Sequence, residues 1–150
     1  TEAGLPAVGD PGSQVVKLCH RHNMGVVPCS GPSSLMLALM GSGLNGQSFA
    51  FLGYIPAKTD ERRQALKSIE KHSASAHQTK IMIETPYRND SLFADILNVC
   101  QGSTELCVAA DITMPDAYIM TKTVAEWKRY VAGKESIIGK RPCVFLILAH

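Results

Sequence analysis

After residue 47, apolar segments of strand length alternate with longer amphipathic segments, and this alternation limits the fold more than any other feature. In the longer segments the apolar residues recur at helical spacing, as Leu92, Phe93, Ile96 and Leu97 do. The loop around Pro115 joins two strands in too few residues for a helical crossover, so that pair is predicted to be antiparallel. We therefore predict a mixed five-stranded α/β domain, with strands at 48–52, 80–84, 106–110, 118–122 and 143–148 and helices at 60–72, 89–100 and 124–131.

The first 43 residues predict a parallel arrangement instead. A helix is predicted at 13–22, a short buried strand at 25–28, and a second helix from residue 34 that ends before Gly43. This order of elements is typical of a parallel α/β sheet. The chain opens in a turn-rich loop with no strand before it. We therefore expect a fragment, in which 1–43 is the tail of a parallel α/β N-terminal domain and 44–150 is a C-terminal α/β domain.

Composition argues against several other classes of protein. The 150 residues are 45% hydrophobic and 19% charged, as in a folded domain, and the formal net charge of +2 does not by itself indicate nucleic-acid binding. The longest apolar run, 144–149, has the length of a strand, so no membrane span is expected. The five cysteines and five histidines lack metal-ligand spacing, and Cys19, Cys107 and Cys143 are predicted to be small core residues in a reducing compartment.

Two loops rich in glycine, proline and serine precede the first two predicted helices. They occupy residues 2–12 and 30–34. Loops of this kind let backbone N–H groups approach a ligand closely, and helix N-termini favour anionic groups. Neighbouring strand-to-helix loops of a parallel sheet meet at one edge, where ligands bind. An ordinary connection is the alternative for each loop, and neither matches a Walker or dinucleotide-binding pattern.

A compact polar cluster follows the strand predicted at 80–84. Glu84 ends this strand, and Tyr87 and Arg88 come in the loop after it. A carboxylate, an aromatic ring and a guanidinium so close together suit a general base beside a polar substrate. Alternatively, Glu84 caps the following helix or pairs with Arg88.

Several motifs occur in an order that resembles the tetrapyrrole methylase superfamily, most closely its branch of small-subunit ribosomal RNA methyltransferases. The resemblance covers nearly the whole chain. The motifs are Glu2-Ala3-Gly4-x-Pro6, Asp10-Pro11-Gly12, Gly31-Pro32-Ser33-Ser34, Gly43 in a Ser-Gly-Leu turn, Phe51-Leu52-Gly53-Tyr54-Ile55-Pro56-Ala57-Lys58 and Glu84-Thr85-Pro86-Tyr87-Arg88.

The resemblance implies a cytoplasmic, homodimeric enzyme that binds S-adenosylmethionine between two α/β domains and methylates a ribose 2′-oxygen of ribosomal RNA. Most of the N-terminal domain would then be missing here. The candidate catalytic residues are Glu84 as a base and Arg88 as a contact for phosphate. No metal is implied. Cofactor contacts are implied at Glu2, Ala3, Gly4, Pro6, Ser30, Gly31, Pro32, Ser33, Ser34, Met82, Ile83, Ala109, Ala110 and Leu148.

The sequence departs from this pattern at several positions. Residues 109–114 read Ala-Ala-Asp-Ile-Thr-Met where the ribosomal RNA branch has Ala-Arg-Glu-Leu-Thr-Lys, and Ile83 and Tyr87 replace an aromatic residue and a histidine. Two other functions therefore stay open: methylation of a tetrapyrrole or corrin precursor, and a non-catalytic module that retains the fold. The isolated chain is expected to have little activity, because the missing segment would supply half of the donor pocket.

Overall fold

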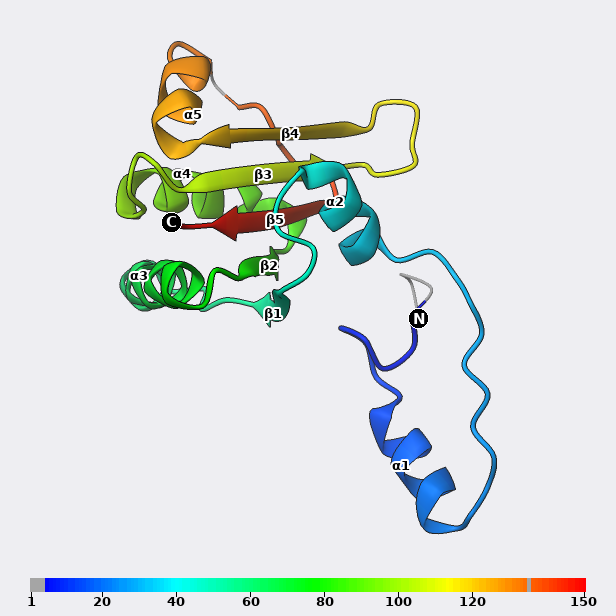
Figure 1. The fold of residues 1–150 in the computed structure, drawn as a ribbon. Helices are drawn as coiled ribbons and strands as arrows, with labels where there is room; N and C mark the ends of the chain where they lie inside the picture. The colour runs from blue at the N-terminus through cyan, green and yellow to red at the C-terminus, as the bar shows by residue number, and fades with distance from the viewer. Residues whose placement is uncertain (1–4, 135) are drawn as a thin grey trace.

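A five-stranded sheet forms the centre of the protein, whose computed structural model describes residues 5–134 and 136–150. β1 and β2 are parallel, and the other three neighbouring pairs are antiparallel. The predicted mixed five-stranded α/β domain is therefore confirmed, including the hairpin around Pro115 (Figure 1). In the order β1-β2-β5-β3-β4, the strands are β1 (Phe49–Tyr54), β2 (Thr79–Ile83), β5 (Cys143–Leu148), β3 (Glu105–Ala110) and β4 (Tyr118–Thr123).

Helices cover both faces of this sheet. α3 (Thr59–Ala76) provides the crossover that the parallel pair β1–β2 requires. It shares one face with α4 (Asn89–Val99) and α5 (Val124–Val131), whereas α2 (Ser34–Ser42) packs on the other face. A single-turn 3₁₀ helix, η1 (Pro86–Arg88), leads from β2 into α4.

The sheet separates two apolar cores, and β5 contributes to both. Alternate residues of a strand point to opposite faces, so Phe145 and Ile147 pack with Trp127 under α3–α5, while Val144 and Leu146 pack with Leu39 under α2. This burial on both faces explains the continuous apolar run at the end of the chain.

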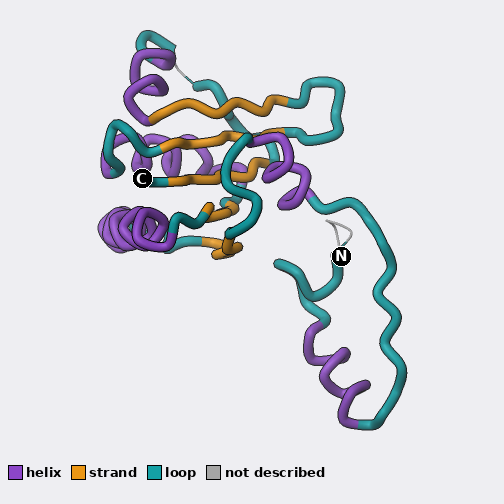
Figure 2. The backbone as a smooth tube through the Cα atoms, viewed as in Figure 1, coloured by secondary structure: helices purple, strands orange, loops and turns teal. Residues whose placement is uncertain are grey.

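α1 and the loop that joins it to α2 lie apart from the sheet (Figures 1 and 2). α1 (Ser13–Arg21) buries no residue, and Cys19, predicted to lie in the core, is only half-buried. The short buried strand predicted at 25–28 is wrong: residues 24–32 form an exposed loop without regular structure, and only Ser33 at its end is buried. No strand within the described residues lies beside this loop, so its backbone has no ladder to join.

α2 packs on the sheet rather than on the segment that precedes it. Leu35, Ala38 and Leu39 are buried against β3 and β5, and Thr121 Oγ1 donates a hydrogen bond to the carbonyl of Ser42 over 2.6 Å. Gly43 ends the helix in the left-handed conformation, at the predicted position. The division of the chain into units at residue 43 stays a prediction.

Within the described residues no helix has both the length and the apolar character that crossing a bilayer would require. Cys107 and Cys143 are buried, as predicted, and so is Cys100.

α5 begins with a reciprocal capping arrangement. Thr123 Oγ1 accepts a hydrogen bond from the Glu126 N–H over 3.2 Å, and the Glu126 carboxylate accepts one from the Thr123 N–H over 2.9 Å. We expect Thr123→Ala to lower the free energy of unfolding by about 1 kcal/mol, the usual effect of losing such a cap. Urea denaturation followed by Trp127 fluorescence measures this change. A loss as small as that of Thr113→Ala, in an exposed loop, would contradict the capping role.

Candidate functional site

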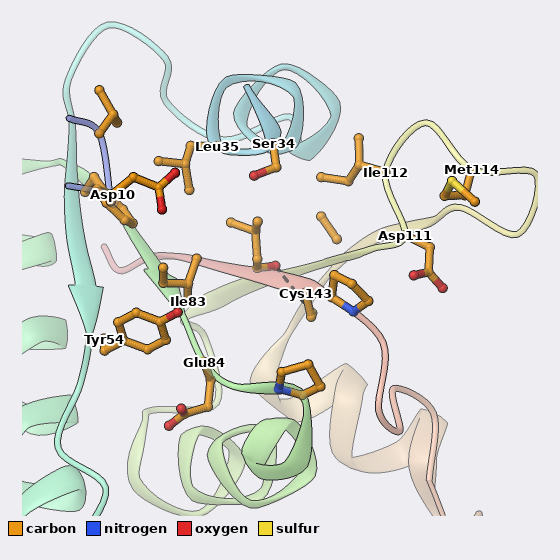
Figure 3. Close-up of a pocket in the computed structure, with 17 residues that line it drawn as sticks. Asp10, Ser34, Leu35, Tyr54, Ile83, Glu84, Asp111, Ile112, Met114 and Cys143 are labelled. Atoms are coloured by element: carbon orange, nitrogen blue, oxygen red, sulfur yellow. Dashed lines mark hydrogen bonds between the residues drawn. The ribbon is translucent and has the colours of Figure 1, made fainter. Parts of the chain in front are cut away.

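A cavity of about 530 Å³ opens at one edge of the sheet, below the first turn of α2 (Figure 3). Its volume lies within the usual range for small-molecule sites. Four strands, α2 and residues 8–10 contribute to its wall. Apolar side chains such as Leu35 and Ile83 form much of this wall, and Asp10, Glu84 and Asp111 add carboxylates.

The direction of β5 explains why three strands meet at this cavity. β5 runs antiparallel to both β2 and β3, so it begins at the edge where they end. Val144 is the pairing partner of Ile83 on one side and of Ala109 on the other. Because paired residues point to the same face, these three side chains form a continuous floor.

Glu84 and Arg88 form an ion pair next to the cavity, in which only the carboxylate is buried. The Glu84 side chain is fully buried, and its Oε1 accepts hydrogen bonds from Arg88 Nη2 over 2.8 Å and from the Thr85 N–H over 2.6 Å. The hydrogen bond to Glu84 and its charge raise the pKa of Arg88 above its ordinary value. Glu84 Oε2 is also buried but has no hydrogen-bond partner among the described residues.

Asp111 marks the end of β3 at the rim of the cavity. Its φ of +49° lies in the left-handed region, which aspartate tolerates better than most residues. The turn places Ile112 and Met114 against the cavity, and the Asp111 carboxylate lies 3.7 Å from Arg141 Nε. Cys143 also lines the cavity, but burial raises its pKa to about 12, so its thiol is not suited to act as a nucleophile.

The structure brings together some of the residues that the sequence singled out. Ser34, Ile83, Glu84 and Ala109 all line the one cavity. Arg88 contacts Glu84 from outside the lining, with its side chain 41% exposed. The alternative in which Glu84 pairs with Arg88 is therefore confirmed, whereas catalytic and cofactor roles stay predictions.

Three predicted contacts on the strands lie elsewhere. Met82 and Ala110 belong to the core under α3–α5, because each is one residue out of phase with the cavity floor. Leu148 is placed at the opposite edge of the sheet, beside Glu105, because β5 runs antiparallel to its neighbours. These three side chains do not line the cavity.

Of the contacts predicted in the described part of the two N-terminal loops, Ser34 alone lines the cavity. Ser30, Gly31 and Pro32 are exposed in the loop at 24–33, and Pro6 is exposed in a turn; none of the four lines the cavity. Ser33 caps α2 by accepting a hydrogen bond from the Met36 N–H over 3.3 Å. Glu2, Ala3 and Gly4 lie outside the described residues.

The cavity wall also includes residues beyond the predicted contacts. Residues 8–10, within the loop predicted to approach a ligand, lie close to β1, where a Cβ on Gly9 would lie 3.6 Å from the Phe51 ring. Sequence reasoning did not assign Tyr54 and Val144 to the site. Val144 would follow from the alternation along β5 once its direction was known, but that direction depends on tertiary packing.

Among solved structures, similar folds occur in methyltransferases. The methyltransferase CobJ matches 97% of this chain and 62% of its own, with a TM-score of 0.59 and 13% identity. Uroporphyrin-III C-methyl transferase from Thermus thermophilus, complexed with S-adenosyl homocysteine, matches 97% of this chain and 62% of its own, with a TM-score of 0.52 and 17% identity. The fold is therefore that of the tetrapyrrole methylases.

Sequence comparison leads to one branch of these proteins. No known family profile matches the chain. Ribosomal RNA small subunit methyltransferase I from Vibrio cholerae is 35% identical over 136 residues, which are 91% of this chain and 46% of the relative. The protein of the same name from Pseudomonas aeruginosa is 30% identical over 147 residues, which are 98% of this chain and 50% of the relative. The chain is similar to these relatives over nearly all of its own length and spans about half of theirs.

Proposed function

We propose that this chain forms part of the methyl-donor pocket of an S-adenosylmethionine-dependent methyltransferase, and that its acceptor is a ribose 2′-oxygen of small-subunit ribosomal RNA. The cavity below α2 carries this proposal, because it joins family-matching segments of the chain into one ligand-sized space. The family's name supplies the ribosomal RNA acceptor. We further propose that the full-length protein is cytoplasmic and forms a homodimer. Each subunit would consist of two α/β domains, with the boundary near residue 43 of this chain.

The residues of the cavity fit this donor. S-adenosylmethionine carries an amine, two ribose hydroxyls and an adenine amino group that can donate hydrogen bonds, and Asp10 and Asp111 place carboxylates in the lining that can accept them. The apolar floor of Ile83, Ala109 and Val144 suits a flat ring. Within the described residues no group of His, Cys, Asp or Glu is arranged to hold a metal ion.

The transfer asks two things of this chain's own residues. When bound, the donor supplies a methyl group on a sulfonium that is already activated, so the protein mainly aligns the acceptor and excludes water. A ribose hydroxyl is a weak nucleophile and gains from a carboxylate that accepts its proton, which we assign to Glu84. Arg88 donates its hydrogen bond to Oε1 of Glu84, so Oε2 is left as the proton acceptor.

The charge of the cavity argues against a tetrapyrrole acceptor in this space. Tetrapyrrole precursors are polycarboxylates, which would need basic partners. The described lining residues include three carboxylates and neither Lys nor Arg. Arg88 and Arg141 reach Glu84 and Asp111 from outside the lining and are already paired. An acidic wall is expected to repel such a substrate.

Calorimetric titration of S-adenosylmethionine and S-adenosylhomocysteine into the full-length protein, alongside this chain, tests the proposal. We expect saturable one-site binding by the full-length protein and weaker binding by the chain alone. If a folded full-length protein binds neither compound, the methyltransferase assignment fails and a non-catalytic module is left. Incubation with small ribosomal subunits then tests the acceptor: a methylated 2′-oxygen blocks alkaline cleavage at the next phosphodiester, whereas a methylated base does not.

A further inference from the structure

An exposed tyrosine stands beside the cavity without a role in the pocket. Tyr87 lies on η1, next to Pro86, which lines the cavity, and it is 80% exposed. Lys140 places its amine 5.1 Å from the centre of the Tyr87 ring. A tyrosine this exposed gains little from folding, and its open ring remains available to a partner.

Hydrogen bonds hold the segment that carries Lys140 in place. Asn89 Nδ2 donates to the carbonyls of Gly139 and Arg141, over 3.3 and 2.7 Å. Arg141 turns back to donate to the carbonyls of Ile137 and Ile138, over 2.7 and 2.8 Å. The Lys140 backbone is therefore fixed beside the cavity rim, while its side chain stays exposed.

The same segment connects this pair to a second aromatic and cationic cluster. The Arg141 guanidinium lies 5.7 Å from the Tyr118 ring. Burial and the neighbouring Tyr130 hydroxyl on α5 raise the pKa of Tyr118 to about 12. Two lysine amines lie over the Tyr130 ring, Lys134 at 3.5 Å and Lys122 at 5.1 Å from its centre. Residues 136–142 lead to the start of β5 (Figure 1), and within them Lys140 contacts Tyr87 while Arg141 contacts Tyr118, so this segment joins the two clusters.

Acidic residues near this path are already engaged. Asp90 accepts hydrogen bonds from Ser136 Oγ and the Gly139 N–H, and Asp111 lies against Arg141. Glu126 is occupied by the cap of α5. Within the described residues, Lys140, Lys134 and Lys122 therefore form no ion pair with a carboxylate.

We propose that Tyr87, Lys140, Tyr130, Lys122 and Lys134 form a tyrosine–lysine track that binds a single-stranded segment of RNA and leads it to the cavity rim. Exposed aromatic rings stack on unpaired bases, and lysines neutralise the phosphates between them. An RNA duplex would present its phosphates but no open base face to Tyr87. This inference rests on the proposed function, because it concerns how the RNA acceptor is held.

Binding of a short fluorescein-labelled single-stranded RNA of mixed sequence to the full-length protein, measured by anisotropy, tests the track. We expect Tyr87→Ala to weaken binding by about 5- to 20-fold, and Tyr87→Phe, which keeps the ring, by less than about twofold. Lys140→Ala should weaken binding and reduce the slope of log affinity against log salt by about 0.7. Lys71→Ala, the same change on an exposed face of α3, is the matched control and should leave binding unchanged.

Two outcomes overturn the track. One is equal RNA affinity of the wild type, Tyr87→Ala and Lys140→Ala; the other is duplex RNA competing as well as single strands. Calorimetry with S-adenosylhomocysteine on the same variants separates the two proposals. The inference is supported if all variants bind S-adenosylhomocysteine as the wild type does and only Tyr87→Ala and Lys140→Ala bind RNA more weakly. Absence of donor binding in the wild type counts against the proposed function, whatever the RNA data show.

Discussion

Replacing Glu84 by Gln in the full-length protein is expected to lower the rate of methyl transfer by about 10²- to 10⁴-fold, the usual contribution of a general base. Glutamine keeps the size of the side chain and can still accept the hydrogen bonds from Arg88 and Thr85. It cannot take up a proton from a ribose hydroxyl at neutral pH. Single-turnover transfer of a radiolabelled methyl group to small ribosomal subunits measures the effect.

A parallel binding measurement distinguishes two roles for Glu84: a general base in the transfer step, and a residue that only binds the methyl donor. If Glu84 acts as the base, the dissociation constant of S-adenosylhomocysteine should change by less than about threefold, because the transfer step alone is affected. Glu105→Gln removes a carboxylate at the opposite edge of the sheet and is the matched control. A Glu84→Gln protein with wild-type single-turnover rate would rule out the base, and unchanged rate with weakened donor binding would leave Glu84 as a donor contact.

The strands and helices after residue 47 followed closely from the sequence because local and tertiary preferences agree there. The predicted strand at 143–148 and the helix at 124–131 have the observed bounds. Continuous apolar runs require burial on both faces of a sheet, and the apolar spacing of Leu92, Phe93, Ile96 and Leu97 requires a helix. The predicted strand at 25–28 failed because Val26 and Val27 suit a strand locally, but a strand exists only with a partner.

The candidate site was only partly predictable for a related reason. Glu84 and Arg88 are four residues apart, so their pairing is a local property that the sequence reveals. The cavity, however, joins β5, α2 and residues 8–10, which are far apart in the chain. That Leu148 lies at the opposite edge from the cavity could not be foreseen, because the direction of β5 within the sheet depends on which strands it pairs with. A motif resemblance identifies which segments contribute to a site. The direction of each strand in the sheet decides which end of that segment lies at the cavity.

The largest expected effect on stability concerns a carboxylate between α3 and α4. Asp95 Oδ2 accepts a hydrogen bond from Arg62 Nε over 2.7 Å, and Oδ1 accepts one from Arg63 Nε over 2.7 Å. The Arg62 side chain is 5% exposed, so removing its partner leaves a buried charge without compensation. Asp95→Asn is therefore expected to lower the free energy of unfolding by about 3 kcal/mol, near the lower end for a broken buried pair because Arg63 is half-exposed.

The same ion pairs predict how acid destabilises the protein. Burial acts to raise the pKa of Asp95, but hydrogen bonds from Arg63 and Arg62 and their charges outweigh it, so this pKa lies below its usual value. A carboxylate of this kind contributes its full stability above the unfolded-state pKa of about 3.9, and the contribution is lost as pH falls through the lower folded-state pKa. Asp95→Asn should therefore remove part of the acid dependence that the wild type shows below about pH 4.

Urea denaturation followed by the fluorescence of Trp127, the only tryptophan of the chain, measures both effects across a pH series. Asp116→Asn makes the same change in the exposed β3–β4 loop and should stay within about 0.5 kcal/mol of the wild type at every pH. Equal stability of the two variants at neutral pH would mean that water compensates Arg62 after the substitution. A wild-type acid dependence retained in Asp95→Asn would instead place the responsible carboxylate elsewhere, with the buried Glu84 the next to test.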